Sequence, residues 1–164
     1  MTPAGLIIRQ AHESDLGRVV ELLLLGPVPG GPPGTEDPAD LGRYRAALRD
    51  IDARGGAVLV AELDGEVVGV CQLIVFRHLQ AHGGLCAEVE SMHVHPDHRN
   101  RGVGAALIGE AIARARALGC YRVQLTSNTA RPDAHRFYER LGFVPSHVGF
   151  KMRLTELRSP TLPR

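Results

Sequence analysis

The stretch EVESMHVHPDHRNRGVGAAL, residues 88–107, constrains the fold more than any other part of the chain. Its first half is predicted to be a strand that ends at Pro96, and its second half a helix that begins at Val103. The loop between them is basic and contains glycine. Because the N–H groups of such a loop and of a helix N-terminus carry partial positive charge, this order of elements predicts an anion-binding site.

The predicted strand changes phase partway along its length. Apolar residues occupy odd positions up to Val89 but even positions at Met92 and Val94. Side chains of a strand alternate between its faces, so a regular strand cannot place both sets on one face. A β-bulge, one extra residue within 90–92, would resolve the conflict. The alternative is a strand that is covered on both faces, where the phase has little meaning.

The remaining chain alternates helix and strand signals in the order β-α-α-β-β-β-α-β-α-β, which predicts an α/β fold with a mixed (α+β) sheet. Asp64-Gly65 is a two-residue hairpin signal. Eight of the nine residues in 26–34 are Gly or Pro, which predicts a loop. The predicted strands are residues 6–9, 57–63, 66–76, 85–95 and 121–126, with one or two closing strands in 143–154, and the predicted helices are 14–25, 38–53, 103–118 and 132–141.

Composition narrows the classes of function. The chain is 44% hydrophobic and 23% charged, as expected for one globular domain over residues 1–164. Its formal net charge of +1 gives no general case for binding nucleic acid or an anionic membrane. No stretch approaches the roughly 20 apolar residues that span a bilayer, and the N-terminus lacks the order of a signal peptide. The three cysteines match no metal or redox pattern, so a cytoplasmic protein with buried thiols is expected.

The loop of residues 88–107 carries a motif of the form R-x-x-G-x-G at Arg99, Gly102 and Gly104, which is neither a Walker loop nor a dinucleotide fingerprint. Between a strand and an amphipathic helix, it resembles motif A of the GNAT superfamily of acetyl-CoA-dependent N-acetyltransferases. The later segment DAHRFYERLGF resembles motif B of the same family. The pattern S-N-x-x-R-x-D-A-H-R-F-Y is also similar to the small-molecule branch that includes the aminoalkylphosphonate N-acetyltransferases. The resemblance implies the GNAT fold and acetyl-CoA as a co-substrate.

The resemblance also implies which residues hold that co-substrate. The glycine loop would wrap the pyrophosphate with six residues: Arg99, Asn100, Arg101, Gly102, Val103 and Gly104. The backbone of Met92, His93 and Val94 would pair with the pantetheine arm. The bulge beside them would present an N–H to the thioester oxygen, where attack by an amine builds negative charge. Three further residues are expected to line the cofactor: Asn128, His135 and Tyr138.

Two residues are predicted to carry the proton transfers. Tyr138 lies where the family has the general acid that protonates the leaving thiolate. A tyrosine with a reference pKa of about 10 suits a thiol with a pKa of about 8.5. The alternative for Tyr138 is a place in the apolar stripe of its helix. Glu90 is predicted to take the proton of the amine or to anchor the acceptor, and Glu88, His93 or a water relay are the alternative bases.

The histidines raise the question of a metal. His93 and His95 share a strand face, but no third ligand stands at a fixed spacing from them, so no metal site is predicted. Dependence of the activity on a divalent metal is left open, because the aminoalkylphosphonate branch is associated with one.

These observations predict transfer of an acetyl group from acetyl-CoA to the primary amine of a small molecule, by direct attack in a ternary complex. A protein or peptide N-acetyltransferase of the same fold is one alternative, and an acyl-CoA-binding regulatory module without catalysis is another. The family often forms dimers, so a homodimer is possible. The acceptor pocket is expected between the loop of residues 26–34, the second helix and the closing strands. Three arginines could meet an acidic group of the acceptor: Arg43, Arg45 and Arg77.

Overall fold

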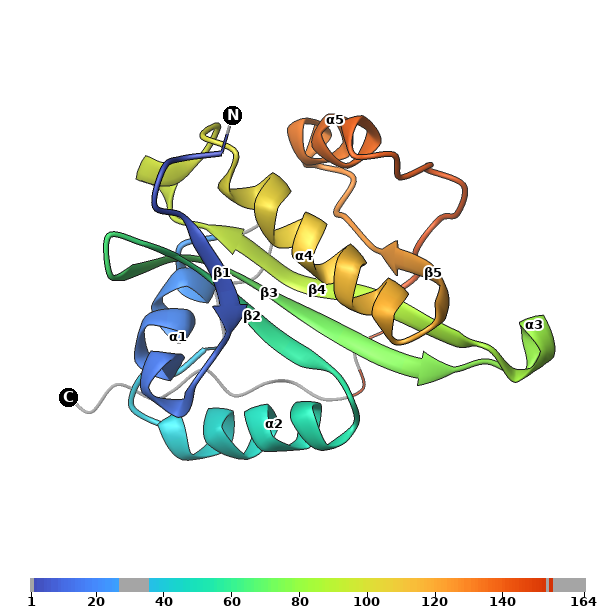
Figure 1. Ribbon diagram of the computed structural model, residues 1–164, viewed down its shortest axis with the longest axis horizontal. Coiled ribbons are helices and arrows are strands. Elements are labelled where there is room, and N and C mark those ends of the chain that lie inside the picture. Colours follow the sequence, from blue (N-terminus) through green and yellow to red (C-terminus); the bar gives the residue numbers. More distant parts are fainter. Residues whose placement is uncertain (1, 27–35, 153, 155–164) are drawn as a thin grey trace.

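A computed structural model describes residues 2–26, 36–152 and 154 (Figure 1). The described residues contain one five-stranded sheet in the order β1-β2-β3-β4-β5. The first three strand pairs are antiparallel, and β4 and β5 are parallel. The strands are β1 Ile7–Gln10, β2 Ala57–Leu63, β3 Glu66–Arg77, β4 Leu85–Val94 and β5 Cys120–Leu125. The helices are α1 Leu16–Leu24, α2 Leu41–Ala53, α3 Gln80–Gly83, α4 Val103–Ala117 and α5 Pro132–Arg140, with 3-10 turns η1 Glu13–Asp15 and η2 Pro96–His98.

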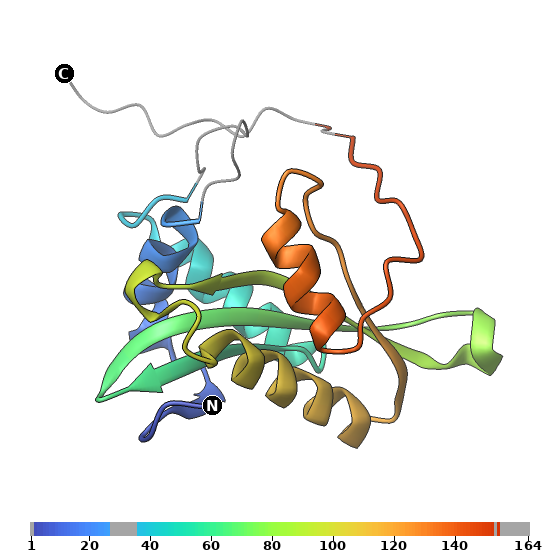
Figure 2. The same cartoon turned by 90° about the horizontal axis from the view of Figure 1, so that it is seen from above.

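The sheet has a hydrophobic core on each face, because the side chains of its central strands alternate. In β2, Leu59 and Ala61 pack with Leu107 of α4 on one face. Val58 and Val60 point to the other face and pack with residues of α1 and α2. The views in Figures 1 and 2 agree with this layering, with α4 and α1 on opposite sides of the strands. The predicted α/β class with helices covering a mixed sheet is confirmed.

The strand and the hairpin turn predicted in the middle of the chain are both confirmed. The strand predicted at 57–63 has those bounds as β2, and Asp64 and Gly65 form the hairpin turn with φ of 53° and 82°. Two consecutive residues with positive φ are typical of a type I′ turn, which fits the twist of a hairpin. On α4, Arg114 Nε donates to Glu110 Oε1 at 2.9 Å, an ion pair between residues four positions apart on the helix.

The β-bulge predicted in β4 is present. Val70 of β3 pairs with His93, and Gln72 pairs with Glu90. Between these two pairs β3 therefore has one residue and β4 has two. Ser91, one of the two, has a positive φ of 52°, as the extra residue of a bulge often does. The apolar residues of β4 on both sides of the bulge pack against the core under α4. The bulge therefore accounts for the phase change in the sequence.

The segment before α2 differs from its prediction. The helix begins at Leu41 rather than at residue 38. The carboxylate of Asp37 accepts the N–H of Ala39 at 2.9 Å, and this local hydrogen bond favours a turn over the first turn of a helix. Of the loop predicted at 26–34, only Gly26 lies within the described residues.

Alternation along the strand predicted at 121–126 would turn Tyr121, Val123 and Leu125 inward. This holds for Val123 and Leu125 but is wrong for Tyr121, which is 45% exposed. Leu85 pairs with Cys120, but the next residue of β4 pairs with Arg122. Tyr121 is therefore bulged out of the ladder, and its ring lies against His78 with 6.3 Å between the centroids.

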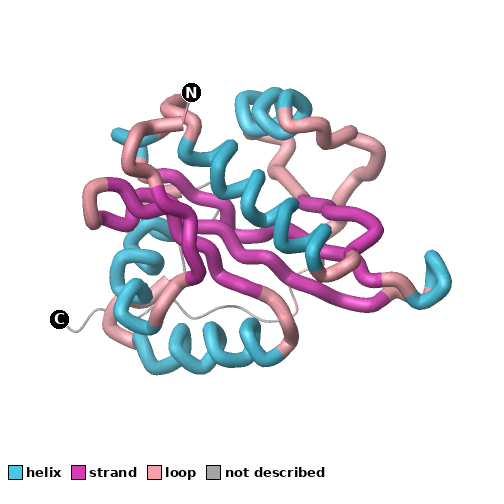
Figure 3. Tube along the Cα trace, viewed as in Figure 1, coloured by secondary structure: helices cyan, strands magenta, loops and turns pink. Residues whose placement is uncertain are grey.

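The closing strands predicted in 143–154 do not form in the described part of that segment. Residues 143–152 are a loop that leads away from α5 (Figure 3). Pro145 has no N–H to give to a ladder, and Gly149 has no side chain to pack on a sheet. Val148 and Phe150 remain 77% and 94% exposed. In the described residues the sheet therefore ends at β5, and the last strand of the predicted order is missing.

A partly buried ion pair joins β1 to the start of the first helical region. Arg9 Nη1 lies 2.7 Å from Asp15 Oδ2, and a second Arg9 nitrogen lies 2.7 Å from Glu62. The backbone N–H of His12 also donates to Asp15, at 2.7 Å. The hydrogen bond from Arg9 lowers the pKa of Asp15 below its ordinary value of 3.8, with help from His12 and against the effect of burial.

We expect Asp15→Asn to lower the free energy of unfolding at pH 7 by about 3 kcal/mol, because the substitution removes the buried carboxylate of a partly buried pair. Since the folded-state pKa is depressed, this stabilisation is complete above 3.8 and is lost as the pH falls through the lowered value. Urea unfolding between pH 7 and pH 2 measures the difference. Asp50→Asn, which breaks an exposed pair with Arg54, is the control and should cost less than about 1 kcal/mol. An equal loss at both ends of the pH range for Asp15→Asn would contradict the assignment.

Candidate active site

The loop of residues 99–104, between β4 and α4, has the backbone geometry of a phosphate cradle, in which several N–H groups can bind one anion. Asn100 and Gly102 have positive φ of 58° and 83°, and Gly102 directly precedes α4. Left-handed residues in such a loop turn successive N–H groups toward one point, and the first turn of α4 adds N–H groups that have no partner within the helix. Arg99 Nε donates to the carbonyl of Val94 at 3.0 Å, which ties the loop to the end of β4.

The first turn of α4 lies close to β4 and α5. A Cβ atom on Gly104 would lie 3.1 Å from Met92 Cε and 3.3 Å from Phe137 Cζ. These distances leave little room for any side chain larger than glycine. The glycine therefore lets three elements meet at the site where the phosphate cradle begins.

The strand β4 has an open edge next to this cradle. Its pairing with β3 continues to Gly69 and Val94, but its pairing with β5 ends at Val89 and Leu125. Figure 1 shows β5 beside only one end of β4. Within the described residues, β4 from Glu90 onward therefore has no strand on its β5 side. An extended chain with amide groups, such as pantetheine, fits such an edge, and this supports the residues predicted to pair with it, Met92, His93 and Val94.

The two candidate carboxylates share one face of β4 but differ in their partners. The ladder with β3 is unbroken from Glu88 to Glu90, so both side chains point away from α4. Glu88 Oε2 accepts a hydrogen bond from Gln124 Nε2 at 3.0 Å. Glu90 makes no side-chain hydrogen bond or ion pair with any residue that the structure describes. Of the two, Glu90 is therefore the carboxylate that is available to a ligand.

His93 lies on the same face as Glu90, since their partners Val70 and Gln72 share a face of β3. Its ring packs on the end of α1, where a Cβ on Gly26 would lie only 2.1 Å from His93 Nδ1. Burial lowers the pKa of His93, and the positive charge of Arg131, the residue before α5, lowers it further. The neutral imidazole can accept a proton, so the geometry keeps His93 as an alternative base.

Tyr138 lies on the side of α5 that faces the core. Its ring contacts those of Phe137 and Phe143, with 5.1 Å and 5.9 Å between centroids. Burial raises the pKa of Tyr138 by more than the positive charge of Arg131 lowers it. The hydroxyl therefore stays protonated at neutral pH, as a general acid must be.

Asn128 and His135, both predicted to line the cofactor, belong to one hydrogen-bonded turn. His135 Nε2 lies 2.9 Å from the carbonyl oxygen of Asn128, and Asn128 Oδ1 accepts the N–H of Ala130 at 2.8 Å. These bonds hold the turn that connects β5 to α5. Beside it, Ser127 has a buried hydroxyl oxygen that lacks a hydrogen-bond partner among the described residues.

The sequence analysis missed Arg131, the residue before α5. Its positive charge lowers the pKa of both His93 and Tyr138. A signal was available, because Arg131 precedes Tyr138 by seven residues, close to two helical turns, and so falls on the same side of α5. The three arginines suggested for an acidic group have other partners. Arg43 lies 2.8 Å from Asp40, Arg45 lies 2.8 Å from Glu13, and Arg77 donates to the carbonyl of Gly83 at 3.1 Å.

The described residues contain no group of three or more His, Cys, Asp or Glu residues that is arranged to hold a metal ion. No helix among them is both long and apolar enough to cross a membrane.

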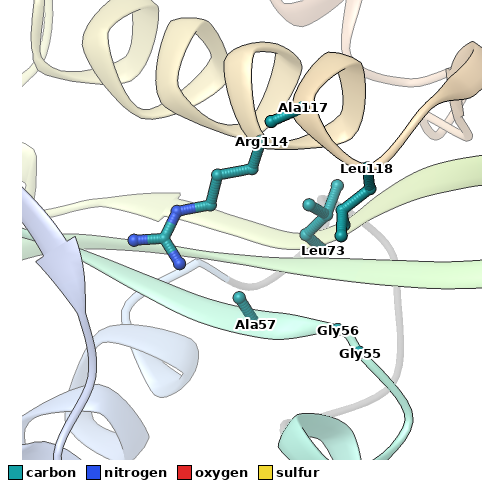
Figure 4. Close-up of a pocket in the computed structure, with 7 residues that line it drawn as sticks. All are labelled: Gly55, Gly56, Ala57, Leu73, Arg114, Ala117 and Leu118. Atoms are coloured by element: carbon teal, nitrogen blue, oxygen red, sulfur yellow. The ribbon is translucent and has the colours of Figure 1, made fainter.

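A cavity of about 280 Å³ lies at the other end of α4 (Figure 4). Its lining is mostly apolar and includes Gly56, Leu73 and Leu118. The one charged lining residue, Arg114, reaches across from α4 and donates to Gln10 at 2.9 Å. A helix of 15 residues is about 22 Å long, so this cavity is remote from the phosphate cradle.

Comparison with known proteins identifies the class. The family model described as the acetyltransferase (GNAT) family matches residues 24–143. An aminoalkylphosphonate N-acetyltransferase from Salmonella typhimurium is 37% identical over 68% of this chain and 62% of its own, so the match spans less than two thirds of that relative. A glucosamine 6-phosphate N-acetyltransferase from Trypanosoma brucei brucei is 32% identical over 83% of this chain and 87% of its own. The crystal structure of a transcriptional regulator from Bacillus halodurans C-125 has a TM-score of 0.80 and 33% identity, over 91% of this chain and 99% of the other.

The chain belongs to the GNAT family of acetyltransferases, whose members use acetyl-CoA as the acetyl donor. The described residues fit this donor in two places. The left-handed backbone at Gly102 and the N-terminus of α4 suit its pyrophosphate, and the open edge of β4 suits its amide-bearing arm.

Proposed function

We propose that this protein transfers an acetyl group from acetyl-CoA to the primary amine of a small molecule, by direct attack in a ternary complex. The observation that carries the proposal is the pair Glu90 and Tyr138. Glu90 is free of partners among the described residues and lies beside the open edge of β4, and Tyr138 is half-buried on the side of α5 that faces the core.

Each residue has one task in this proposal. Acetyl-CoA supplies the acetyl group as an activated thioester. Glu90 takes a proton from the acceptor amine as its nitrogen bonds to the acetyl carbon, and Tyr138 gives a proton to the sulfur as the carbon–sulfur bond breaks. The N–H groups at the bulge around Ser91, where the backbone has a positive φ, stabilise the negative charge on the carbonyl oxygen.

The acceptor is proposed to be small and to carry an acidic group beside the amine. The two relatives described above act on an aminoalkylphosphonate and on glucosamine 6-phosphate. Both are primary amines with a phosphorus oxyanion. The cytoplasm is the proposed location, in keeping with the three free cysteines, and a homodimer remains a prediction.

The experiment is acetyl-CoA turnover against a panel of primary amines, with initial rates measured while both substrates are varied. Direct attack predicts double-reciprocal lines that intersect. Parallel lines would indicate an acetyl-enzyme and would contradict the ternary complex. The absence of turnover with every amine would contradict the proposed function itself.

Glu90→Gln is expected to lower kcat/KM about 100-fold, because the amide cannot take a proton from the amine. Glu88→Gln is the matched control, since Glu88 lies on the same face of β4 but is bound to Gln124. The control should stay within about threefold of the wild type, far less than the loss of a general base. A large loss for Glu88→Gln, with none for Glu90→Gln, would reverse the two roles. A loss for His93→Gln alone would assign the base to His93.

One observation favours a second function. The Bacillus halodurans structure, at 33% identity, is described as a transcriptional regulator. A non-catalytic module that binds acyl-CoA would bind coenzyme A tightly and acetylate none of the amines. Titration calorimetry alongside the turnover assay separates the two functions.

A further inference from the structure

The hairpin of β3 and β4 extends beyond the rest of the sheet, and its tip at α3 projects from the molecule (Figures 1 and 2). The ladder of β3 with β2 ends at Leu73, whereas its ladder with β4 continues to Arg77. Among the residues that the structure describes, residues 74–77 therefore have a neighbouring strand on one side only. We call residues 74–84 the arm.

The open edge of the arm presents backbone hydrogen-bonding groups. The N–H of His78 donates to the carbonyl of Gly84 at 2.9 Å, which makes these two residues a hydrogen-bonded pair of the antiparallel ladder. Such pairs alternate with non-hydrogen-bonded pairs along the ladder. Val75 and Arg77 therefore direct their N–H and C=O groups away from β4, toward the open edge. An edge of this kind is a template for another strand.

The arm is braced by the start of β5. The ring of His78 lies against those of Phe76 and Tyr121, with 5.2 Å and 6.3 Å between centroids. Arg122 Nη2 lies 3.3 Å from His78 Nε2. These contacts tie the arm to the body of the protein. Its open edge is therefore held in a fixed position, which lowers the entropy cost of binding a partner.

Leu79, at the tip of the arm, is fully exposed. Three more large apolar residues are exposed at this end of the molecule: Ile74, Leu118 and Tyr121. The cavity of about 280 Å³ lies at the base of the arm, since Leu73 and Leu118 line it. Exposed apolar residues grouped in this way are typical of a protein–protein interface. The same chain thus offers both an apolar projection and an apolar cavity.

Two copies of the open edge can pair antiparallel about a two-fold axis in one register that suits both backbones. If Arg77 faced Arg77 of the second copy, like charges would be opposed. If Val75 faced Val75, Arg77 would face Leu73, where β2 already occupies that edge. The remaining register pairs Val75 with Arg77 of the second copy, which joins their N–H and C=O groups directly. It places Phe76 on the axis, where an aromatic pair stabilises a sheet.

This register brings Leu79 to the cavity of the second copy. Two residues beyond Arg77, Leu79 comes opposite Leu73 of the second copy, at the point where β2 begins. Leu73, Gly56 and Ala57 line the cavity there. The two-fold axis repeats the contact, so each copy fills the cavity of the other.

The charges around this contact are complementary. The arm carries Arg77 and two histidines and has no acidic residue. On the other side, the last turn of α2 leads to the cavity and has acidic but no basic residues. One of them, Asp52, accepts a hydrogen bond from Gln10 at 2.9 Å and forms no ion pair with any described residue. A cation near the C-terminus of a helix is also favoured by the helix dipole.

We propose that two copies of this chain form a dimer through their arms, with residues 74–77 paired antiparallel and Leu79 of each copy in the cavity of the other. The interface is remote from the proposed base. Leu85, where β4 begins, precedes Glu90 by five residues, about 17 Å along an extended strand. Dimerisation is therefore independent of the proposed acetyl transfer and can be measured without it.

Sedimentation velocity of the full chain at micromolar concentration should show a dimer. Leu79→Glu should raise the dimer dissociation constant about 100-fold, because a charge would enter each apolar cavity. Ile7→Glu is the matched control, since Ile7 is an exposed apolar residue of β1, and it should leave the dimer intact. Acetyl-CoA turnover per chain should be the same in all three proteins.

Cysteine cross-linking tests the register in variants that keep Leu79. Phe76→Cys should give a disulfide-linked dimer on oxidation, because residues that face each other in a non-hydrogen-bonded pair have Cα atoms about 4.5 Å apart. Ile74→Cys is the control, because two residues that each stand two places from the axis lie about 14 Å apart, beyond the reach of a disulfide. The wild-type chain gives the background from its three free cysteines.

A wild-type chain that stays monomeric at high micromolar concentration would overturn the inference. So would a dimer that survives Leu79→Glu, or one that Ile7→Glu dissociates. Cross-linking of Ile74→Cys without cross-linking of Phe76→Cys would overturn it as well. A dimer with these properties but without turnover of any amine would instead support the interface and contradict the proposed acetyl transfer.

Discussion

Tyr138→Phe is expected to lower kcat about 100-fold or more, because the thiolate would leave without a proton donor. The phenyl ring keeps the contacts with Phe137 and Phe143, so the melting temperature and the affinity for coenzyme A should change little. Steady-state kinetics and calorimetry of the same preparation measure the two effects separately. Loss of a positioned general acid should thus appear in the chemical step alone.

Tyr121→Phe is the control for Tyr138→Phe, since Tyr121 lies on the bulged and exposed part of β5. Its kcat should equal that of the wild type. A kcat for Tyr138→Phe within about threefold of the wild type would mean that solvent protonates the thiolate, and that Tyr138 belongs only to the core stripe of α5.

The second large effect is expected at the phosphate cradle. Gly102 has a φ of 83°, where a β-branched residue is strained. Gly102→Val should turn the backbone N–H groups of the loop away from the pyrophosphate and raise the dissociation constant of coenzyme A about 100-fold, as several charged hydrogen bonds are lost or weakened. Calorimetric titration with coenzyme A measures this dissociation constant.

Gly109→Ala controls for general effects on α4. Gly109 is an exposed helical residue, and a Cβ atom there meets nothing within 4 Å. The substitution should raise the free energy of unfolding by about 1 kcal/mol and leave coenzyme A binding unchanged. Wild-type affinity in Gly102→Val would show that the loop does not need its left-handed backbone to bind the donor.

Local patterns predicted most of the fold, because they reflect local physics. The hairpin at Asp64-Gly65 and the bulge near Ser91 follow from φ preferences and from the two-residue period of a strand. The misses share a cause. Tyr121 has an ordinary strand pattern, and its displacement depends on how β4 and β5 are matched in register. The alternating pattern of 143–154 likewise predicts a strand, but a strand also needs a neighbour, which a single segment cannot specify.

The candidate site divides in the same way. The loop of residues 99–104 and Tyr138 could be predicted because their motifs are continuous in the sequence. Glu90 was preferred to Glu88 from the sequence, but the hydrogen bond that occupies Glu88 could not be predicted, since Gln124 comes from another strand. Arg131 was missed for a similar reason. Its relation to His93 exists only after β5 and α5 bring the two segments together.

The bulge in β4 has a consequence for changes in chain length. Between the pairs Val70–His93 and Gln72–Glu90, β4 has one residue more than β3. Removing Ser91 would therefore restore a regular ladder and would leave Glu90, Met92 and His93 each on its present face. An insertion or deletion elsewhere in β4 would instead move every later side chain to the opposite face. The bulge, residues 91 and 92, is thus the part of β4 that can lose a residue without turning the later core side chains to the active-site face.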